Sequence, residues 1–372
     1  MPIRDDRISK NFPRVIRMKG IEFSGGKASV EDVEVPAELV SGHVFIKVHA
    51  VGVGPFDIGT VFTGVTKYFS NSRQSKGFGS EFSGVVVSVG DSVARLKVGD
   101  EVFGVLADPV RERSGYEYIS VKESVCALKP DNITHEEAAS LAFDCMIAER
   151  ALRLAEARNT DSLLITGGIL NLSRILTQVA SSSMFDSVEW IAGTVDTVSD
   201  KEYAESVGIA ETFTTSSNDG DWSLPFTSGI NRKVYDIVID TVGDSKHAKK
   251  LLNKESGRYV SLYNKPSPDE LVDYSKRVSQ DHVILKSRYR GFLRSILTGS
   301  TGRISYCSGR YFSALPTGDG EVLERLSVLI ETGIVTPLVE RVFPLSEVSE
   351  AVEMVKSNWR SIKGKVVVRF VC

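Results

Sequence analysis

The sequence predicts a two-domain α/β protein, in which a β-rich part and a part with alternating strands and helices each bury a core. Three observations predict this fold class. The chain has 372 residues, more than one ordinary hydrophobic core holds. Residues 14–105 mostly alternate apolar and polar side chains, at the period of a β-strand. From residue 134 onward, strand-like and helix-like segments follow one another, which is typical of a parallel sheet with right-handed crossovers.

The β-rich part contains strand-like stretches separated by turn signals. These stretches are residues 14–23, 28–35, 43–53 and 81–105. Glycines stand between them or inside the longest one, at Gly25, Gly26, Gly42, Gly90 and Gly99, where glycine permits the backbone angles of a tight turn. We expect strands joined by short loops over this part of the chain.

The second part begins with a helical pattern at residues 136–157 and continues with alternating elements. Strands are predicted at 163–168, 187–195, 235–243 and 257–263, and helices at 201–208, 245–253 and 320–333. The last stretch returns to strand character at 338–345 and 363–371, with a helix at 347–358 between them. No internal repeat interrupts this order.

Composition excludes several classes of function. Hydrophobic residues make up 42% and charged residues 25% of the chain, and the net charge is −3, so a nucleic-acid partner is not expected. No apolar run approaches the about 20 residues of a membrane span. The four cysteines have no paired spacing, which fits a reducing compartment. The first 20 residues lack a long apolar core, so we expect a cytoplasmic protein, with a mitochondrial presequence only weakly indicated.

The strand predicted at 163–165 leads into a glycine turn and then a helix, the order that holds a pyrophosphate in dinucleotide-binding proteins. Gly167 and Gly168 form the turn, but Leu170 and Ser173 occupy the positions of the later glycines. Asn171 follows the leucine and tolerates a left-handed backbone. Two interpretations remain open: an altered loop that still binds the cofactor, or a strand–turn–helix that has lost it.

The end of the next strand selects between NAD and NADP. NAD sites place an acidic residue there, whereas NADP sites use basic or small polar groups. Thr194 occupies this position approximately, Asp196 follows it, and Lys201 lies a turn further on. The arrangement favours NADP, with a solvated Lys201 as the structural alternative.

Several segments together resemble the medium-chain dehydrogenase/reductase superfamily, in its zinc-free, quinone-oxidoreductase-like (zeta-crystallin-like) branch. They are residues 51–58, 77–104, 138–152, 235–243, 257–263 and 333–355. The resemblance implies a GroES-like β-barrel domain at 1–133, completed by 335–372, and a Rossmann doubly wound parallel-sheet domain at 134–334. It also implies hydride transfer from NADPH to a quinone or an α,β-unsaturated carbonyl, and a homodimer joined at the last strands, for which 303–309 suits an edge strand.

The resemblance also implies that no metal is bound. Zinc-dependent relatives carry Cys and His where this chain has Gly54 and Ser80. Glu81 persists alone, and one carboxylate does not hold a zinc ion, which needs three protein ligands at a catalytic site.

Further site residues are assigned by the resemblance. Gly167, Gly168 and Asn171 would hold the pyrophosphate. Val242, in the motif 240–243, would lie beside the ribose and nicotinamide, and Leu262 and Tyr263 would line the nicotinamide side.

The substrate pocket is assigned in the same way. Gly54 stands where relatives carry the Asn of a VNPxD motif, and Ile147 where they often carry Thr. Arg288 and Tyr289 are further candidates for its lining, and Tyr68 is the candidate proton donor.

Two classes of function are therefore expected. The main one is an NADPH-dependent reductase of a quinone or enone, whose chemistry the cofactor carries. The alternative is a catalytically inactive protein of the same fold that serves as a binding or assembly subunit. The segment 271–310 is basic in its middle and suits a substrate lid or a partner-binding surface.

Overall fold

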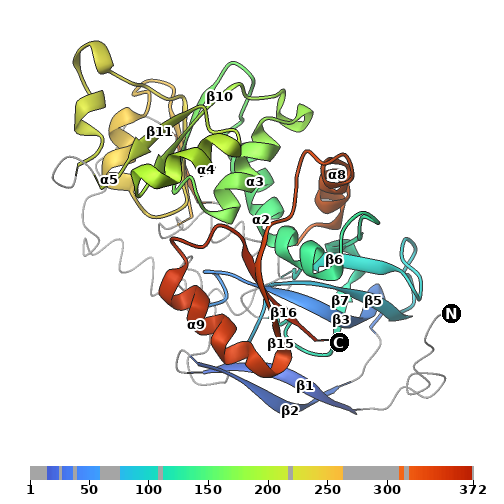
Figure 1. Ribbon diagram of the computed structural model, residues 1–372. Helices are drawn as coiled ribbons and strands as arrows, with labels where there is room; N and C mark the ends of the chain where they lie inside the picture. Colours follow the sequence, from blue (N-terminus) through green and yellow to red (C-terminus); the bar gives the residue numbers. More distant parts are fainter. Residues whose placement is uncertain are drawn as a thin grey trace, which may run out of the picture. The chain divides into compact units, whose positions relative to one another are not determined.

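The computed structural model describes residues 15–24, 27–36, 40–58, 76–107, 112–216, 221–262, 310–313 and 318–370. The chain divides into two compact units (Figure 1). The β-rich unit comprises residues 1–60, 71–146 and 316–372, and the parallel-sheet unit comprises residues 61–70 and 147–315. None of the helices in the described ranges combines the length and apolar character of a membrane span.

The parallel-sheet unit is built on six strands in its described ranges, in the order β11-β10-β9-β12-β13-β14. Every neighbouring pair is parallel. The strand order reverses between β9 and β12, which is the switch point where doubly wound sheets bind ligands. The predicted fold class is thus confirmed. The strands are β9 (Ser162–Thr166), β10 (Trp190–Val195), β11 (Glu211–Thr214), β12 (Ile237–Asp240), β13 (Arg258–Ser261) and β14 (Arg310–Ser313).

Short helices connect these strands. α3 (Asn171–Ala180) follows β9, α4 (Lys201–Ser206) follows β10, and α5 (Ser245–Ala248) follows β12. The central strands β9 and β12 are buried along nearly their whole length, as expected where both faces of a parallel sheet are covered. One buried cluster joins Leu164, Val238 and Tyr259 of the sheet to Phe213 and Trp222.

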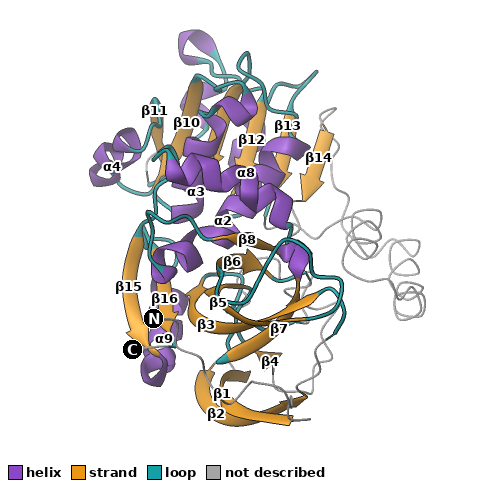
Figure 2. Ribbon diagram, turned by 90° about the vertical axis from the view of Figure 1, so that its right-hand side faces the viewer, coloured by secondary structure: helices purple, strands orange, loops and turns teal. Residues whose placement is uncertain are grey.

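The β-rich unit contains a seven-stranded sheet within the described ranges (Figure 2). Strand β16 pairs with β3 in antiparallel fashion, so the two halves of the chain share one sheet. The path is β15-β16-β3-β5-β6-β8, and β7 pairs with β3. The strands are β3 (His43–Val53), β5 (Glu81–Val89), β6 (Glu101–Val105), β7 (Tyr118–Lys122), β8 (Cys126–Leu128), β15 (Val339–Pro344) and β16 (Lys365–Arg369).

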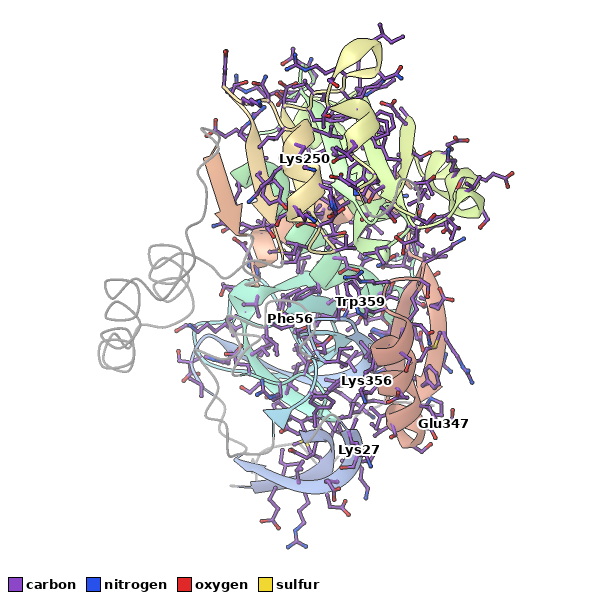
Figure 3. The ribbon with its side chains drawn as sticks, turned by 90° about the vertical axis from the view of Figure 1, so that its left-hand side faces the viewer. Lys27, Phe56, Lys250, Glu347, Lys356 and Trp359 are labelled. Carbon is purple, nitrogen blue, oxygen red and sulfur yellow. The ribbon has the colours of Figure 1, made fainter. Side chains whose placement is uncertain are left out.

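A smaller sheet and three helices complete the β-rich unit. Its described strands run in the order β2-β1-β4. Helix α9 packs against β2. In Figure 3, Lys356 labels the helix and Lys27 labels the strand. α8 packs against β8, and α2 belongs to this unit up to residue 146. The elements are β1 (Val15–Ser24), β2 (Lys27–Pro36), β4 (Lys76–Gly77), α2 (His135–Leu154), α8 (Gly320–Glu331) and α9 (Val348–Asn358).

Candidate functional site

The turn between β9 and α3 lies at the switch point of the parallel sheet. Gly167 has φ of +69°, a left-handed conformation that glycine adopts without strain. A Cβ there would lie 2.5 Å from Val242 Cγ1, so this position also needs glycine for the close approach of β12. The Gly167 amide donates a hydrogen bond to the Thr194 hydroxyl oxygen at 2.9 Å, and the Gly168 amide donates one to the Thr194 carbonyl oxygen at 2.6 Å. Thr194 therefore fixes the turn, and its side chain is buried.

The two non-glycine residues of the loop are both accommodated. Leu170 is buried, and its Cδ1 lies 3.1 Å from the position that a Cβ on Gly167 would take, so its side chain leans back over the turn. Ser173 is buried where α3 meets the end of β12, with its Oγ 3.4 Å from Thr241 Oγ1. The small side chain still lets helix and strand approach closely.

The start of α3 has no side-chain cap. Leu170 is the N-cap residue, and it offers no side-chain acceptor to the first turn. The first N–H groups of a helix have no partner within the helix and form a site for an anion unless they are capped. Arg174, which the sequence reasoning missed, lies in this first turn and is 3% exposed. Its Nη2 donates to Asn171 Oδ1 at 3.0 Å. The signal available in the sequence was an arginine shortly after a glycine turn, and its burial is seen only in the structure.

The end of β10 is tied to the end of β11. Thr215 Oγ1 donates to Asp196 Oδ1 at 2.9 Å, so Asp196 is engaged in a loop contact. Lys201 begins α4 and is half-buried.

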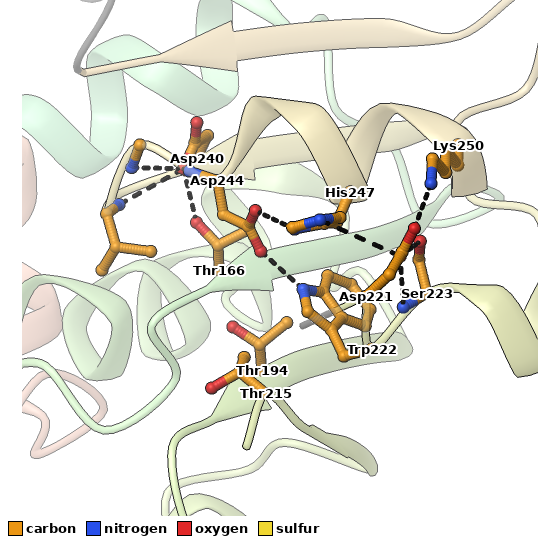
Figure 4. Close-up of polar contacts among 12 residues, drawn as sticks. Thr166, Thr194, Thr215, Asp221, Trp222, Ser223, Asp240, Asp244, His247 and Lys250 are labelled. Carbon is orange, nitrogen blue, oxygen red and sulfur yellow. Dashed lines mark hydrogen bonds and ion pairs between the residues drawn. The ribbon is translucent and has the colours of Figure 1, made fainter. Parts of the chain in front are cut away.

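Asp240 organises the end of β12 (Figure 4). This buried carboxylate accepts hydrogen bonds from Thr166 Oγ1 at 2.7 Å and from the Gly243 and Asp244 amides at 2.8 and 3.0 Å. Its Oδ2 accepts one from the Tyr259 hydroxyl at 2.6 Å. Charge-assisted bonds of this kind are stronger than neutral ones. They fix the backbone of the motif 240–243.

Two predicted cofactor residues belong to this strand end. Val242 follows β12 and is half-buried. Leu262 follows β13 and is buried, and its amide donates to the Asp240 carbonyl at 3.1 Å.

A second polar network lies beside Asp240 (Figure 4). Trp222 Nε1 donates to Asp244 Oδ2 at 2.5 Å, and the other oxygen of Asp244 lies 2.6 Å from His247 Nδ1. Lys250 forms an ion pair with Asp221. The network connects residues 221–223 to α5 and to the residues after it, and we interpret its role as structural.

The β-rich unit holds a buried group of charges around Gly54. The Lys365 ammonium group, with a side chain 5% exposed, lies 2.7 Å from Glu81 Oε1 and 3.5 Å from Asp144 Oδ1. A Cβ on Gly54 would lie 3.1 Å from Lys365 Nζ and 3.8 Å from Asp57 Oδ2. The Asp57 carboxyl group accepts a hydrogen bond from the Gly54 amide, with 2.8 Å between Gly54 N and Asp57 Oδ2. One ammonium group and three carboxyl groups therefore share one buried region.

Burial determines the charge states in this region. Burial raises the pKa of Glu81, and Asp144 raises it further, although the Lys365 ammonium opposes both. Burial likewise raises the pKa of Asp57. For Lys365, burial alone would lower the pKa, but Asp144, Glu81 and Asp57 together raise it above its usual value. The ammonium thus stays charged, while Glu81 and Asp57 take up protons more readily than ordinary carboxyl groups.

The residues at this place do not fit a catalytic zinc. Gly54 and Ser80 offer no nitrogen or sulfur ligand, and Glu81 is paired with an ammonium group. Zinc needs three protein ligands of the Cys, His or carboxylate type at a catalytic site. Within the described ranges no group of three such side chains is placed to hold a metal ion.

The remaining predicted site residues divide into two groups. Ile147 is buried in α2. Tyr68, Tyr263, Arg288 and Tyr289 lie outside the described residues, as do the predicted edge strand 303–309 and nearly all of segment 271–310.

Comparison with known proteins agrees with this architecture. Residues 40–131 match the family model of the alcohol dehydrogenase GroES-like domain, and residues 208–368 match that of zinc-binding dehydrogenases. The chain is 23% identical over 370 residues to "NAD(P)H oxidoreductase RTN4IP1, mitochondrial" of Dictyostelium discoideum, covering 94% of this chain and 99% of that protein. It is 28% identical over 357 residues to a chloroplastic NADPH-dependent alkenal/one oxidoreductase of Arabidopsis thaliana, covering 91% and 74%.

Solved structures share the fold. The structure of the quinone oxidoreductase from Coxiella burnetii superposes with a TM-score of 0.72 at 22% identity, covering 96% of this chain and all of that one. Both units, the strand order of the parallel sheet and the alignment along nearly the whole chain lead to one conclusion: the chain belongs to the medium-chain dehydrogenase/reductase superfamily.

Proposed function

We propose that this chain is a zinc-independent, NADPH-dependent reductase of a quinone or an α,β-unsaturated carbonyl compound. The observation that supports it most is the uncapped start of α3, at the switch point of the parallel sheet and directly after the Gly167 turn. Amide donors in the first turn of a helix suit a pyrophosphate. The relatives named as NADPH-dependent alkenal/one oxidoreductase and as 2-methylene-furan-3-one reductase favour the same substrate class.

Residues that follow β9, β10, β12 and β13 would hold the cofactor in this proposal. The turn at Gly167 and Gly168 and the first turn of α3 at Asn171 would receive the pyrophosphate. Lys201 would pair with the phosphate that distinguishes NADPH from NADH. Val242 and Leu262 would lie beside the nicotinamide, and NADPH when bound supplies the hydride. Thr194 acts in this proposal by holding the turn.

The proposal extends to assembly and compartment. β14 is an edge strand of the parallel sheet within the described ranges, and an exposed edge invites pairing with a second copy. A homodimer is therefore proposed, and light scattering at micromolar concentration would test it. Cys126 and Cys145 are buried free thiols, which suits a reducing compartment, the cytoplasm or the mitochondrion.

Thermal unfolding with and without NADPH tests cofactor binding, because a ligand of the native state raises the melting temperature. We expect NADPH to stabilise the wild type more than NADH does. Leu170→Gly/Ser173→Gly should tighten NADPH binding by restoring close backbone approach. Leu170→Ala/Ser173→Ala is the matched control, since it removes the leucine bulk without adding glycine freedom.

One pattern of results would replace the proposal with the inactive binding or assembly subunit. It is a wild type that does not bind NADPH at millimolar concentration, together with a double glycine variant that does. The natural loop would then be a disabled one.

A further inference from the structure

Asp240 is a buried carboxyl group that the fold surrounds with hydrogen-bond donors (Figure 4). Thr166 Oγ1 and the amides of residues 242–244 donate to its Oδ1, and the Tyr259 hydroxyl donates to its Oδ2. An ionised carboxyl group is an acceptor at both oxygens, so this set of partners suits the charged form. No Lys, Arg or His of the described ranges forms an ion pair with it. Within these ranges, hydrogen bonds alone stabilise the negative charge.

This charge lies at the edge of the parallel sheet where the cofactor is proposed to bind. Asp240 is the last residue of β12 and pairs in register with Thr166, the last residue of β9, directly before the Gly167 turn. The strand order reverses between these two strands, and doubly wound sheets bind ligands at such a point. One of the amides bonded to Oδ1 is that of Val242, which the proposed function places beside the nicotinamide. The carboxylate and the proposed nicotinamide site thus belong to one strand end.

The hydrogen-bonding pattern alone does not require a charge here. The side-chain oxygen of an asparagine could accept the same bonds from Thr166 and the three amides. An ionised group loses more hydration on burial than an amide does, so its burial costs more free energy. The charge of Asp240, as distinct from its hydrogen bonds, is therefore the feature that calls for a functional explanation.

We propose that the Asp240 carboxylate favours the oxidised form of the bound cofactor and thereby assists hydride donation. This inference rests on the proposed function. When bound, NADPH supplies a hydride, which is a proton with two electrons, to the β carbon of the substrate, and its neutral nicotinamide ring becomes a pyridinium cation. The C=C π electrons of the substrate move to its carbonyl oxygen, and the α carbon takes a proton from water. Asp240 exchanges no proton and acts as a fixed negative charge near developing positive charge.

The surroundings of Asp240 strengthen such an effect. Its side chain is fully buried, and a charge acts more strongly in a medium of low dielectric constant than in water. Its hydrogen bonds hold it in place before the reaction, so little reorganisation is needed. The neighbouring carboxyl group of Asp244 differs, because it lies 2.6 Å from His247 Nδ1 and also accepts from Trp222. Asp240 is thus the carboxylate of this strand end whose charge no described basic side chain shares.

Calorimetric titration with NADPH and with NADP⁺ tests the proposal without turnover. Asp240→Asn keeps the size of the side chain and removes its charge. We expect it to raise the ratio of the Kd of NADP⁺ to the Kd of NADPH by roughly 10-fold, the effect of a unit charge over about 10 Å at an effective dielectric constant of about 20. A residue that only held the backbone in place would change both Kd values by the same factor.

Two control variants separate charge from structure. Tyr259→Phe removes one hydrogen bond to the same carboxylate but keeps the charge, so the Kd ratio should stay at the wild-type value. Asp236→Asn neutralises a carboxyl group that precedes β12, at the opposite end of the strand, where it accepts from the Ser162 amide and hydroxyl at 3.0 and 2.8 Å. It should also leave the ratio unchanged. If Asp240→Asn alone does not fold, Tyr259→Phe/Asp240→Asn compared with Tyr259→Phe gives the same test.

The outcomes distinguish this inference from the proposed function. A ratio that rises with Asp240→Asn, in a wild type that binds both cofactor forms but reduces neither quinones nor enones, would support the inference while the proposed function fails. An unchanged ratio in Asp240→Asn, or an equal rise in either control, would overturn the inference and leave the proposed function standing. A wild type that binds neither form of the cofactor would overturn both.

Discussion

The hydrogen bonds that converge on Asp240 predict a specific pattern of unfolding free energies. In Asp240→Asn the amide oxygen must take the place of Oδ1, because four donors face that side: Thr166 Oγ1 and the amides of residues 242–244. The amide nitrogen then replaces Oδ2 and meets the Tyr259 hydroxyl, whose oxygen lies 2.6 Å from it in the wild type. The hydroxyl would then have to rotate and accept a hydrogen bond from a neutral amide instead of donating one to a carboxylate.

The expected cost follows from that one contact. Losing a hydrogen bond to a charged acceptor removes about 1.5–3 kcal/mol from the free energy of unfolding, and we expect about 2 kcal/mol for Asp240→Asn by that principle. Tyr259→Phe alone should cost about 1–2 kcal/mol. In the Tyr259→Phe background, Asp240→Asn should cost about 1 kcal/mol or less, because the charge-assisted bond to the hydroxyl is already gone. The coupling energy of the pair is therefore about 1 kcal/mol or more.

Urea unfolding followed by tryptophan fluorescence measures these values, with Trp222 as a reporter buried in the same unit. Tyr235→Phe is a matched control: its hydroxyl bonds to Glu211 at 3.0 Å, away from Asp240. The reasoning would be refuted if Asp240→Asn cost the same in the wild type and in the Tyr259→Phe background.

Three further outcomes are expected. Burial lowers the pKa of His135 to about 4 in the folded protein. Between about pH 6.5 and 4, the unfolded state therefore binds a proton at His135 that the folded state does not bind. The free energy of unfolding should then fall by about 2 kcal/mol, discounted for partial solvent contact, as the pH drops from about 6.5 to 4, and His135→Gln should reduce that slope in urea titrations. Gly52→Ala should destabilise by about 3 kcal/mol or more, because its Cβ would lie 2.1 Å from Glu81 Oε1 and 2.5 Å from the Ala139 carbonyl; a melting temperature like that of the wild type would contradict this. EDTA should leave the melting temperature unchanged, and elemental analysis should find no stoichiometric zinc, since Gly54 and Ser80 offer no ligand.

Much of the parallel sheet was predictable because its strands carry a local signal. The apolar runs at residues 163–165 and 237–239 are short and bounded by polar or turn residues, which indicates buried strands. The handedness of crossovers restricts their order in the sheet without determining it. The pairing of β16 with β3 could not be derived from periodicity, because it joins residues far apart in the chain. Only the resemblance to a family supplied it.

The candidate site was less predictable, because its contacts are long-range. Glu81 was identified in the sequence, but as an isolated carboxylate. Its partner Lys365 follows in the last strand, where a lysine after glycine reads as a solvated charge. Thr194 was expected near the cofactor from its place at a strand end. The structure shows its hydroxyl and carbonyl holding the turn, a role that no strand pattern reveals.

The loop after β9 shows why counting glycines is an incomplete measure of cofactor binding. Dinucleotide-binding loops carry glycines at the positions of Leu170 and Ser173 for two separate reasons. One is close approach of the phosphate to the backbone, and the other is close packing of the helix on the strand. Ser173 meets the second need, because its small side chain is buried against Thr241. Leu170 concerns only the first, and its side chain leans toward Gly167. A helix without a Ser, Asp or Asn cap is less stable by about 1 kcal/mol, and Leu170 provides no side-chain cap to α3. In the proposed function, the amides at the start of α3, more than the glycines, would receive the phosphate.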